Sequence, residues 1–457
     1  MADSFDAIVV GSGPGGYHAA IRAAQLGLKT ACIEKDTIGG RCLNYACIPA
    51  KTILHTAELY DEAANNAGNL GIKVEGVSVD WGAAQARREK VRKTLTGGVG
   101  MLFEKNKVEF IEGEGSLTED GNVKVGRKTY EAKGVVLAAG SVALSIPGVE
   151  FGGRVLDTWG AWSLEELPKS MAVVGAGASG SEIASGYGRL GTDVLLIEML
   201  DQILPLEDAD SARVVGRAFK KQNIQIATGT KVEKVEGGDD SVKVTYGDQS
   251  AEVDYLVIAG GRAPDTEALG LDAAGVKTEE KTGRIEIDEY QRTSNEKVYA
   301  IGDLVRGAAL AHKAQEEGIV AVERIAGVET HPVDVDLIPG ATFCHPQVAS
   351  VGMTEAEAKE SGREIKVGKF NLGGVGAAAV YDDRQGIVKI IADAEYGEII
   401  GAHIVGNRAC DMIAELVDTM ALEGGYQELS RIVHAHPTIS EAILDAGRAV
   451  DGWAIHQ

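Results

Sequence analysis

The chain has 457 residues, 44% of them hydrophobic and 25% charged, which is the balance of a globular protein and excludes a fibrous or wholly disordered chain. Its length predicts about three domains. Acidic residues (68) outnumber basic ones (45), and the net charge of -23 argues against a nucleic-acid-binding surface. The 59 glycines show no collagen-like period, so we expect them at tight turns and close backbone approaches.

We expect neither an export signal nor a membrane segment in this sequence. Residues 1–6 lack the basic region of a signal peptide. The longest uncharged stretches, 134–149 and 337–354, are interrupted by Gly, Ser and Pro, so neither supplies the roughly 18 apolar residues of a membrane helix. Five cysteines, an odd number in a long chain, favour a reducing compartment. We therefore expect a cytoplasmic protein.

The first unit, residues 6–34, reads DAIVVGSGPGGYHAAIRAAQLGLKTACIE. A β-branched run predicts a buried strand, and Gly11, Gly13 and Gly16 follow it before an alanine-rich helical stretch. A second strand ends on Glu34, 23 positions after the first glycine. This order is typical of a dinucleotide site, where glycines let the backbone approach a pyrophosphate and the acid binds a ribose hydroxyl.

The same unit recurs 164 residues later, in residues 171–198 (MAVVGAGASGSEIASGYGRLGTDVLLIE). Its glycines are Gly175, Gly177 and Gly180, and its acid is Glu198, again 23 positions after the first glycine. One pattern repeated at a constant offset indicates an internal duplication. No Lys or Arg stands next to Glu198, and an acid repels a 2′-phosphate, so we expect NAD rather than NADP in this copy.

Each copy closes with a short β-meander that returns to a buried strand, residues 123–141 in the first and 242–262 in the second. Aligning the two ends leaves 43 additional residues in the first copy, and these contain a pair of cysteines. A later strand, residues 298–303, ends on Gly302-Asp303. An acid at the carboxyl end of a strand lies where α/β sheets bind ligands, although a plain surface strand end has the same pattern.

Residues 39–51, GGRCLNYACIPAK, place Cys42 and Cys47 five positions apart. Cα atoms five apart on a regular helix are too distant for a disulfide, so a bond here requires an irregular first turn. Pro49 suits a first helical position, so we expect a helix from about Pro49, with Cys47 at its N-terminus, where the macrodipole favours a thiolate. Two buried free thiols are the alternative; a zinc site lacks a second ligand pair. We expect the other cysteines to be buried and inert: Cys32, Cys344 and Cys410.

Together these motifs resemble the flavoprotein disulfide reductases, also called pyridine nucleotide-disulfide oxidoreductases. Two GxGxxG units flank the GGxCxxxxCIPxK segment and a GD follows late, so the resemblance covers nearly the whole chain. Glutathione-reductase-like and mercuric-reductase-like enzymes are the alternatives within the family. Four further stretches are similar to its dihydrolipoamide dehydrogenase branch: EKDTIGGRCLNYACIPAK, LAHKAQEEG (310–318), ATFCHPQVASVGMTEAEA (341–358) and HAHPTISEA (434–442).

The resemblance implies an α/β fold with two Rossmann-like three-layer nucleotide-binding domains and an α+β C-terminal dimerisation domain. It implies a homodimer that oxidises dihydrolipoamide to lipoamide with FAD and NAD, in a 2-oxo acid dehydrogenase or glycine cleavage complex. The implied partner is a lipoyl-bearing carrier protein or a dihydrolipoyl acyltransferase subunit, whose usually basic binding domain would suit the acid excess. The implied domains are FAD-binding (1–148, with the redox disulfide), NAD-binding (149–268), a central continuation of the FAD-binding domain (269–337) and dimerisation (338–457).

Carried over to the matching positions, the resemblance also implies roles for single residues. Cys42 is implied to exchange with the substrate and Cys47 to lie against the flavin. Lys51 is implied to lie beside the flavin, paired with Glu182. The cofactor-binding residues implied for the two nucleotides are Gly11, Gly13, Gly16, Glu34, Lys51, Gly140, Asp303, Gly175, Gly177, Gly180, Glu198 and Gly261.

Spacing alone leaves the acid/base histidine open. His436-Pro437 has Glu441 five positions on, and His331-Pro332 also has an acid, Asp336, five positions on. A carboxylate bonded to one ring nitrogen fixes the tautomer and stabilises imidazolium. The resemblance to HPTxxE selects His436, oriented by Glu441 and placed at the partner subunit's disulfide, with Pro437 able to begin a helix. We expect structural roles for His434, His345 and His312.

The sequence departs from the family pattern in several places, among them Ala50 before Lys51, where Ser is usual, and Arg41, where Thr is commoner. Ala178 and Ser179 stand where the family usually carries larger residues that screen the flavin, which leaves nicotinamide gating open. Residues 371–380, NLGGVGAAAV, are less polar than the corresponding family segment.

Overall fold

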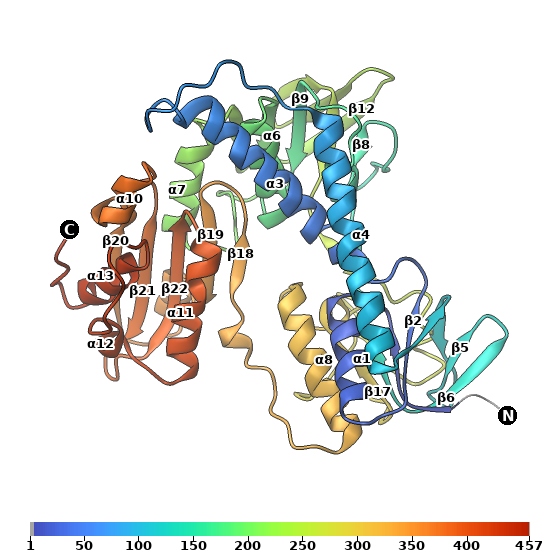
Figure 1. Cartoon of the computed structure of the whole chain (residues 1–457). Helices are drawn as coiled ribbons and strands as arrows, with labels where there is room; N and C mark the ends of the chain where they lie inside the picture. Colours follow the sequence, from blue (N-terminus) through green and yellow to red (C-terminus); the bar gives the residue numbers. More distant parts are fainter. Residues whose placement is uncertain (1–3, 457) are drawn as a thin grey trace. The chain divides into compact units, whose positions relative to one another are not determined.

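The computed structural model describes residues 4–456. It confirms the mixed α/β architecture (Figure 1), and the chain divides into two compact units. The first unit contains the residues up to Thr52, 85–144 and 261–335, and the second contains 53–84, 145–260 and the residues from Asp336 onward. No helix within the described residues is long and apolar enough to cross a membrane.

The first unit is built on a seven-stranded sheet in the order β3-β2-β1-β6-β5-β4, with β17 also paired to β6. β1 runs parallel to both β2 and β6. Strands covered on both faces are apolar along most of their length, and residues 7–10 of β1 are all buried. The strands are β1 (Ser4–Val10), β2 (Thr30–Glu34), β3 (Glu109–Glu112), β4 (Gly115–Leu117), β5 (Val123–Val125), β6 (Lys128–Leu137) and β17 (Val298–Ala300).

Helices α1 (Pro14–Gln25) and α8 (Ala311–Ala326) pack side by side against this sheet (Figure 1). A separate two-stranded ribbon pairs β7 (Ser141–Ala143) with β16 (Arg262–Pro264). Two short elements of this unit are α2 (Gly40–Asn44) and a 3-10 turn, η2 (Gly302–Leu304). The chain continues from one unit into the other along α3 (Cys47–Asp61), which leads to the π-helical turn η1 (Glu62–Asn66), and along α4 (Trp81–Asn106).

The second unit holds the second copy of the repeat. Its five-stranded sheet has the order β11-β10-β9-β15-β8, and β9 runs parallel to β10 as β1 does to β2. A three-stranded meander, β12-β13-β14, precedes β15. The elements are β8 (Val155–Leu156), α5 (Thr158–Trp162), β9 (Ser170–Val174), α6 (Ala178–Arg189), β10 (Asp193–Ile197), α7 (Ala209–Phe219), β11 (Ile224–Ala227), β12 (Val232–Gly237), β13 (Val242–Tyr246), β14 (Gln249–Val253) and β15 (Tyr255–Ile258).

The C-terminal part of the second unit is an antiparallel sheet, β18-β19-β22-β21-β20. Helix α11 packs on β19 and β22, and α13 packs on β20 and β21. β22 is buried along its whole length, so this sheet has its own apolar core. The elements are η3 (Val335–Leu337), β18 (Gly340–Thr342), β19 (Gln347–Gly352), α9 (Glu355–Glu360), β20 (Ile365–Asn371), η4 (Leu372–Gly374), α10 (Gly376–Val380), β21 (Ile387–Asp393), β22 (Ile399–Gly406), α11 (Ala409–Ala421), α12 (Tyr426–Leu429) and α13 (Glu441–Ala449).

Candidate functional site

The first glycine turn joins β1 to α1, and close contacts require its glycines. Gly11 has φ +104, and a Cβ there would lie 2.3 Å from the Ala138 carbonyl oxygen. A Cβ on Gly16 would lie 1.9 Å from the Gly11 carbonyl oxygen. Gly13 is the N-cap of α1, has no side-chain cap in the described residues, and faces open space where a Cβ would stand. The turn therefore presents open backbone and a helix N-terminus to an anion such as a pyrophosphate.

The second turn, between β9 and α6, repeats this geometry 164 residues later. Gly175 has φ +95, and a Cβ on Gly180 would lie 1.8 Å from the Gly175 carbonyl oxygen. Gly177 is again an N-cap with open space around it. Ala178 and Ser179, which follow it, are both exposed. The duplication read from the sequence therefore extends to backbone conformation.

The acid after each second strand is held by the same two backbone bonds in both copies. Each carboxylate accepts from the N–H of the residue after the first glycine and from the N–H two positions beyond itself. These distances are 2.8 and 3.0 Å for Glu34 and 2.7 and 2.9 Å for Glu198. Both acids are buried, so each negative charge is fixed at the strand end where a ribose hydroxyl can donate to it. In each copy, the open helix N-terminus and the fixed carboxylate fit the pyrophosphate and the ribose of an adenine dinucleotide.

Asp303 lies in the turn η2, directly after β17. Its carboxylate accepts a hydrogen bond from the Ser141 hydroxyl, and Arg262 Nε lies 4.0 Å from it. Ser141 and Arg262 come from the paired strands β7 and β16, each of which follows a glycine of positive φ, Gly140 (+78°) and Gly261 (+149°). The β7–β16 ribbon thus brings the ends of both nucleotide units next to Asp303.

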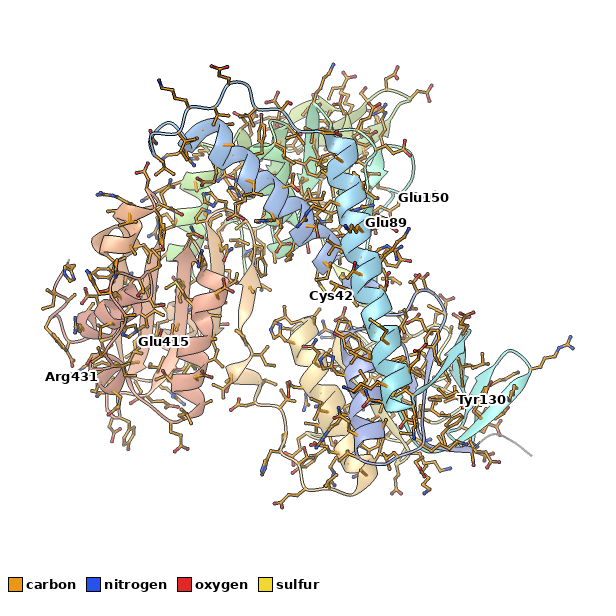
Figure 2. All side chains as sticks on the ribbon, viewed as in Figure 1. Cys42, Glu89, Tyr130, Glu150, Glu415 and Arg431 are labelled. Atoms are coloured by element: carbon orange, nitrogen blue, oxygen red, sulfur yellow. A yellow bond between two sulfur atoms is a disulfide. The ribbon has the colours of Figure 1, made fainter. Side chains whose placement is uncertain are left out.

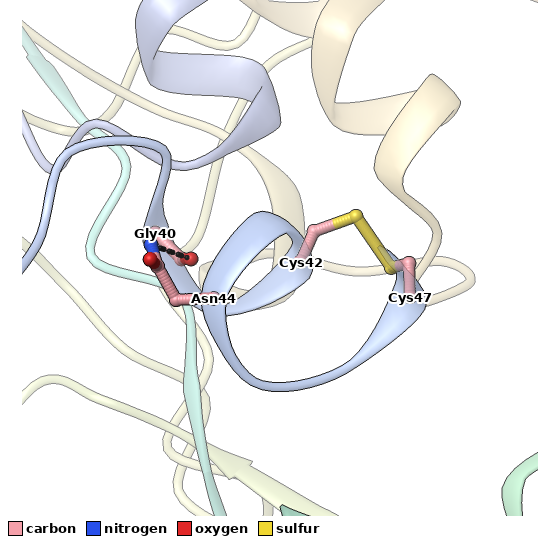
Figure 3. The surroundings of a disulfide bond; sticks show 4 residues. All are labelled: Gly40, Cys42, Asn44 and Cys47. Carbon is pink, nitrogen blue, oxygen red and sulfur yellow. Dashed lines mark hydrogen bonds between the residues drawn. A yellow bond between two sulfur atoms is a disulfide. The ribbon is translucent and has the colours of Figure 1, made fainter. Parts of the chain in front are cut away.

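The structure joins Cys42 and Cys47 in a disulfide, with Cα atoms 4.7 Å apart (Figure 3). The helical turn α2 ends at Asn44, and α3 begins at Cys47, so the irregular break that a bond requires lies between the two cysteines. Asn44 is buried and its amide donates to the Gly40 carbonyl at 2.9 Å (Figure 3). Arg92 on α4 donates to the Asn44 side-chain oxygen at 2.8 Å. Asn44 and Arg92 were not found from the sequence, because nothing local marks them.

The predicted helix start near Pro49 is wrong by two residues, because α3 begins at Cys47. Proline is tolerated there because N–H groups of a first turn have no partner within the helix. Cys47 is therefore the first residue of α3, where the helix dipole stabilises a thiolate. Lys51, one turn later on α3, adds a cation to the same helix end.

Glu182 is buried on α6, where its Oε1 accepts a hydrogen bond from the Phe343 N–H at 2.9 Å. This contact spans 161 residues of sequence and was not predicted. The pairing of Glu182 with Lys51 stays a prediction.

The three other cysteines, Cys32, Cys344 and Cys410, form no disulfide within residues 4–456. Cys32 and Cys344 are buried, and burial raises the pKa of both thiols, which makes them unreactive. Cys410 is only partly buried, contrary to the prediction, and its Sγ lies 3.6 Å from the Val348 carbonyl oxygen. Cys410 is the second residue of α11, and side chains at the end of a helix are less covered by neighbours than those in the centre of a strand.

His436 and Glu441 form the pair predicted from HPTxxE, with Nδ1 2.9 Å from Oε1. The other oxygen, Oε2, accepts from the Thr438 N–H at 2.9 Å. Burial opposes ionisation of Glu441, but the bonds from Thr438 and His436 hold its pKa below the ordinary value. The His436 side chain is 75% exposed, so its second ring nitrogen is open to a reactant. A Cβ on Gly376 would lie 3.9 Å from His436 Cε1, so this one residue of the segment 371–380 lies next to the histidine.

The expected helix start at Pro437 is wrong, because α13 begins at Glu441. His436-Pro437 is a cis peptide outside that helix. Glu441 is instead the first helical residue, where the dipole favours a carboxylate.

Two other histidines are less exposed than His436, and their pKa values shift in opposite directions. His434 Nε2 lies 2.6 Å from Oε1 of Glu415, which is labelled on α11 in Figure 2, and this bond raises the pKa of His434. Burial lowers the pKa of His345 to about 4. The His434 side chain is only 6% exposed and His345 is partly buried, while the His436 side chain is open to solvent.

Comparison with known proteins matches residues 5–318 to the pyridine nucleotide-disulphide oxidoreductase family and residues 338–446 to the dimerisation domain of the same family. A dihydrolipoyl dehydrogenase of Rhizobium etli is 42% identical over 99% of this chain and 100% of its own length. The dihydrolipoyl dehydrogenase of Bacillus subtilis is 39% identical (99% of this chain, 97% of its own). A leghemoglobin reductase of Glycine max is 41% identical (98% and 88%).

Two solved structures superimpose on nearly the whole chain. One is the Cu(II) complex of the HOCl-induced flavoprotein disulfide reductase RclA of Escherichia coli, with a TM-score of 0.88, 26% identity, and coverage of 98% of this chain and 99% of that chain. The other is LpdA of Mycobacterium tuberculosis, with a TM-score of 0.88, 25% identity, and coverage of 97% and 99%. The glycine turns, the disulfide and these matches agree, and the chain therefore belongs to the pyridine nucleotide-disulphide oxidoreductase family.

Proposed function

We propose that this protein is an FAD-dependent, NAD-linked dihydrolipoyl dehydrogenase, which oxidises dihydrolipoamide to lipoamide. The observation that carries the proposal is the Cys42–Cys47 disulfide at the start of α3 in a chain that also carries an exposed His436–Glu441 pair. Full-length relatives at 39–42% identity named dihydrolipoyl dehydrogenase support it. Glutathione-reductase-like or mercuric-reductase-like chemistry is the less favoured alternative.

The chain's own residues account for the exchange. His436 of one subunit takes the proton of one substrate thiol, and the resulting thiolate attacks Cys42 Sγ of the other subunit, so that a mixed disulfide forms and the Cys42–Cys47 bond there breaks. Cys47 leaves as a thiolate, which the N-terminus of α3 stabilises. The second substrate sulfur then attacks the first substrate sulfur, and the bond between that sulfur and Cys42 Sγ breaks. Lipoamide closes, and Cys42 leaves with the second thiol's proton. Two electrons have passed from the substrate to the cysteine pair.

The two glycine turns and their acids would hold the nucleotides. Gly11, Gly13, Gly16, Glu34 and Asp303 would bind FAD, and Gly175, Gly177, Gly180 and Glu198 would bind NAD. When bound, FAD supplies the two-electron link between a dithiol and a nicotinamide. Lys51 would lie beside the flavin, with Glu182 as its partner, and Gly140 and Gly261 would border the two sites.

The proposed domains are residues 1–148 and 269–337 for FAD binding, 149–268 for NAD binding and 338–457 for dimerisation. The match of residues 338–446 to the dimerisation domain supports a homodimer. In that dimer, His436 would serve the partner subunit's disulfide. A lipoyl-bearing carrier or acyltransferase subunit is the proposed partner, and the net charge of -23 suits a basic binding domain. We place the enzyme in the cytoplasm.

The test is to assay the purified protein with dihydrolipoamide, glutathione disulfide and mercuric ion, each with NAD(H) and NADP(H). We expect turnover with dihydrolipoamide and NAD. Cys42→Ser should abolish it, while Cys410→Ser, which alters a partly buried cysteine outside the disulfide, should not. Preferential turnover of glutathione disulfide or mercuric ion, or a preference for NADP, would contradict the proposal.

A further inference from the structure

Two charged side chains are buried beneath the Gly302–Asp303 turn, and the chemistry above does not use them. Lys313 and Glu317 lie one turn apart on α8, with side chains only 1% and 5% exposed. Lys313 Nζ is 2.6 Å from Glu317 Oε1. Removing two charges from water is costly unless further hydrogen bonds satisfy them. The other hydrogen-bond partners of Lys313 and Glu317 therefore indicate the role of the pair.

Those remaining partners are the two backbone groups of one residue. The Gly302 N–H donates to Glu317 Oε2 at 2.7 Å, and Lys313 Nζ donates to the Gly302 carbonyl oxygen at 3.4 Å. Gly302 has φ +69, a conformation that glycine adopts without strain. Both sides of this residue are therefore held by the same ion pair, immediately before Asp303.

Helix α8, which carries the pair, also packs closely against the start of α1, next to the Gly11–Gly16 turn. A Cβ on Gly15 would lie 2.6 Å from the Ala314 carbonyl oxygen, and a Cβ on Gly318 would lie 2.6 Å from the Gly15 carbonyl oxygen. α1 and α8 therefore approach backbone to backbone, side by side in Figure 1. Since α1 begins at the pyrophosphate turn, α8 joins that turn to the Gly302–Asp303 turn through rigid contacts.

We propose that Lys313 and Glu317 are positioning residues that hold the Gly302–Asp303 turn in register with the pyrophosphate turn for FAD binding. Glu317 supplies the acceptor for the Gly302 N–H. Lys313 neutralises that acceptor, so that its charge does not repel the neighbouring Asp303 carboxylate. The inference rests on the proposed place of Asp303 at FAD.

The experiment measures the affinity of the deflavo-protein for FAD by fluorescence titration, with the melting temperature of each deflavo-form recorded in parallel. Glu317→Leu removes the acceptor, and we expect FAD binding to weaken about tenfold or more. Glu317→Gln keeps an acceptor oxygen for the Gly302 N–H, and we expect affinity within roughly threefold of wild type. This rescue separates positioning from charge alone.

The matched control breaks an ion pair that joins α1 to α8. Arg22 Nη2 lies 2.6 Å from Glu323 Oε1, whereas the side chains bonded to Gly302 are those of Glu317 and Lys313. Glu323→Gln should lower the melting temperature without changing FAD affinity. If Glu317→Leu does not fold, the variant Lys313→Met/Glu317→Met removes both charges together and is expected to bind FAD about tenfold more weakly.

The proposal is overturned if Glu317→Leu or the double variant binds FAD as wild type does, or if Glu323→Gln loses the same affinity. Asp303→Asn in the same titration tests separately whether Asp303 contacts FAD. If Asp303 does not contact FAD, this variant alone keeps the wild-type affinity. No dihydrolipoamide enters the titration, and a failure of the proposed substrate would leave these results unaffected.

Discussion

Glu441→Gln isolates what the carboxylate contributes to His436. Glu441 Oε1 lies 2.9 Å from His436 Nδ1, and Oε2 accepts the Thr438 N–H. The amide of glutamine has a similar shape, and its oxygen can still accept from Thr438, so the start of α13 is preserved. The variant loses the negative charge that stabilises the imidazolium formed when His436 takes the substrate proton.

The size of the effect follows from that one bond. Hydrogen bonds to charged groups contribute about 1.5–3 kcal/mol, and 1.4 kcal/mol corresponds to a factor of ten. We therefore expect kcat/KM for dihydrolipoamide to fall roughly 10- to 100-fold. His436 is 75% exposed in the single chain, and solvent screening moves the expectation toward the lower end wherever the partner subunit does not cover it. Steady-state formation of NADH measures the change.

Glu415→Gln is the matched control, because it breaks another imidazole–carboxylate pair, whose histidine, His434, lies two residues before His436. His434 lies 2.6 Å from Glu415, and its side chain is only 6% exposed. This variant should lower the unfolding midpoint and leave kcat/KM near the wild-type value. The reasoning is refuted if Glu441→Gln stays within about twofold of wild type, or if both variants lose activity equally.

Three further predictions concern stability and nucleotide choice. Lys389 Nζ is 2.7 Å from Asp208 Oδ1 and both side chains are 2% exposed, so Lys389→Met strands a buried carboxylate and should cost about 3–5 kcal/mol in urea unfolding; a loss below about 1 kcal/mol would contradict this. Burial holds the pKa of His345 at about 4, below its ordinary 6.5, so the unfolded chain binds the extra proton between these values. Stability should therefore fall as pH drops from about 6.5 to about 4, and His345→Gln should flatten that part of the curve. Glu198→Gln removes the charge that repels a 2′-phosphate, and we expect the NAD-over-NADP ratio of kcat/KM to fall roughly tenfold; an unchanged ratio would remove Glu198 from nucleotide selection.

The features found from the sequence are those that short segments determine. The spacing of Gly11, Gly16 and Glu34 could be read directly, since each forms its contacts with the turn or with neighbouring strands. The same holds for the Cys42–Cys47 bond, where an irregular turn was required and is present. Helix starts were placed less well, because a proline is compatible with several first-turn positions and the sequence does not choose among them.

The features missed from the sequence depend on residues far apart in the chain. Glu182 bonds to a backbone group 161 residues away, and Lys389 reaches a carboxylate 181 residues away. The Lys313–Glu317 pair has helical spacing, which by itself indicates a surface ion pair. Only the packing of α8 under the Gly302 turn shows that it is buried.

The central claim is that dihydrolipoamide reduces the Cys42–Cys47 disulfide. The direct measurement is to add one equivalent of dihydrolipoamide to the oxidised holoenzyme anaerobically and without NAD, quench with an alkylating reagent under denaturing conditions, and map the labelled cysteines by mass spectrometry. Relative to the untreated enzyme, we predict new label on Cys42 and Cys47 and no change at Cys32. A Cys42–Cys47 disulfide that stays intact while lipoamide forms would contradict the account.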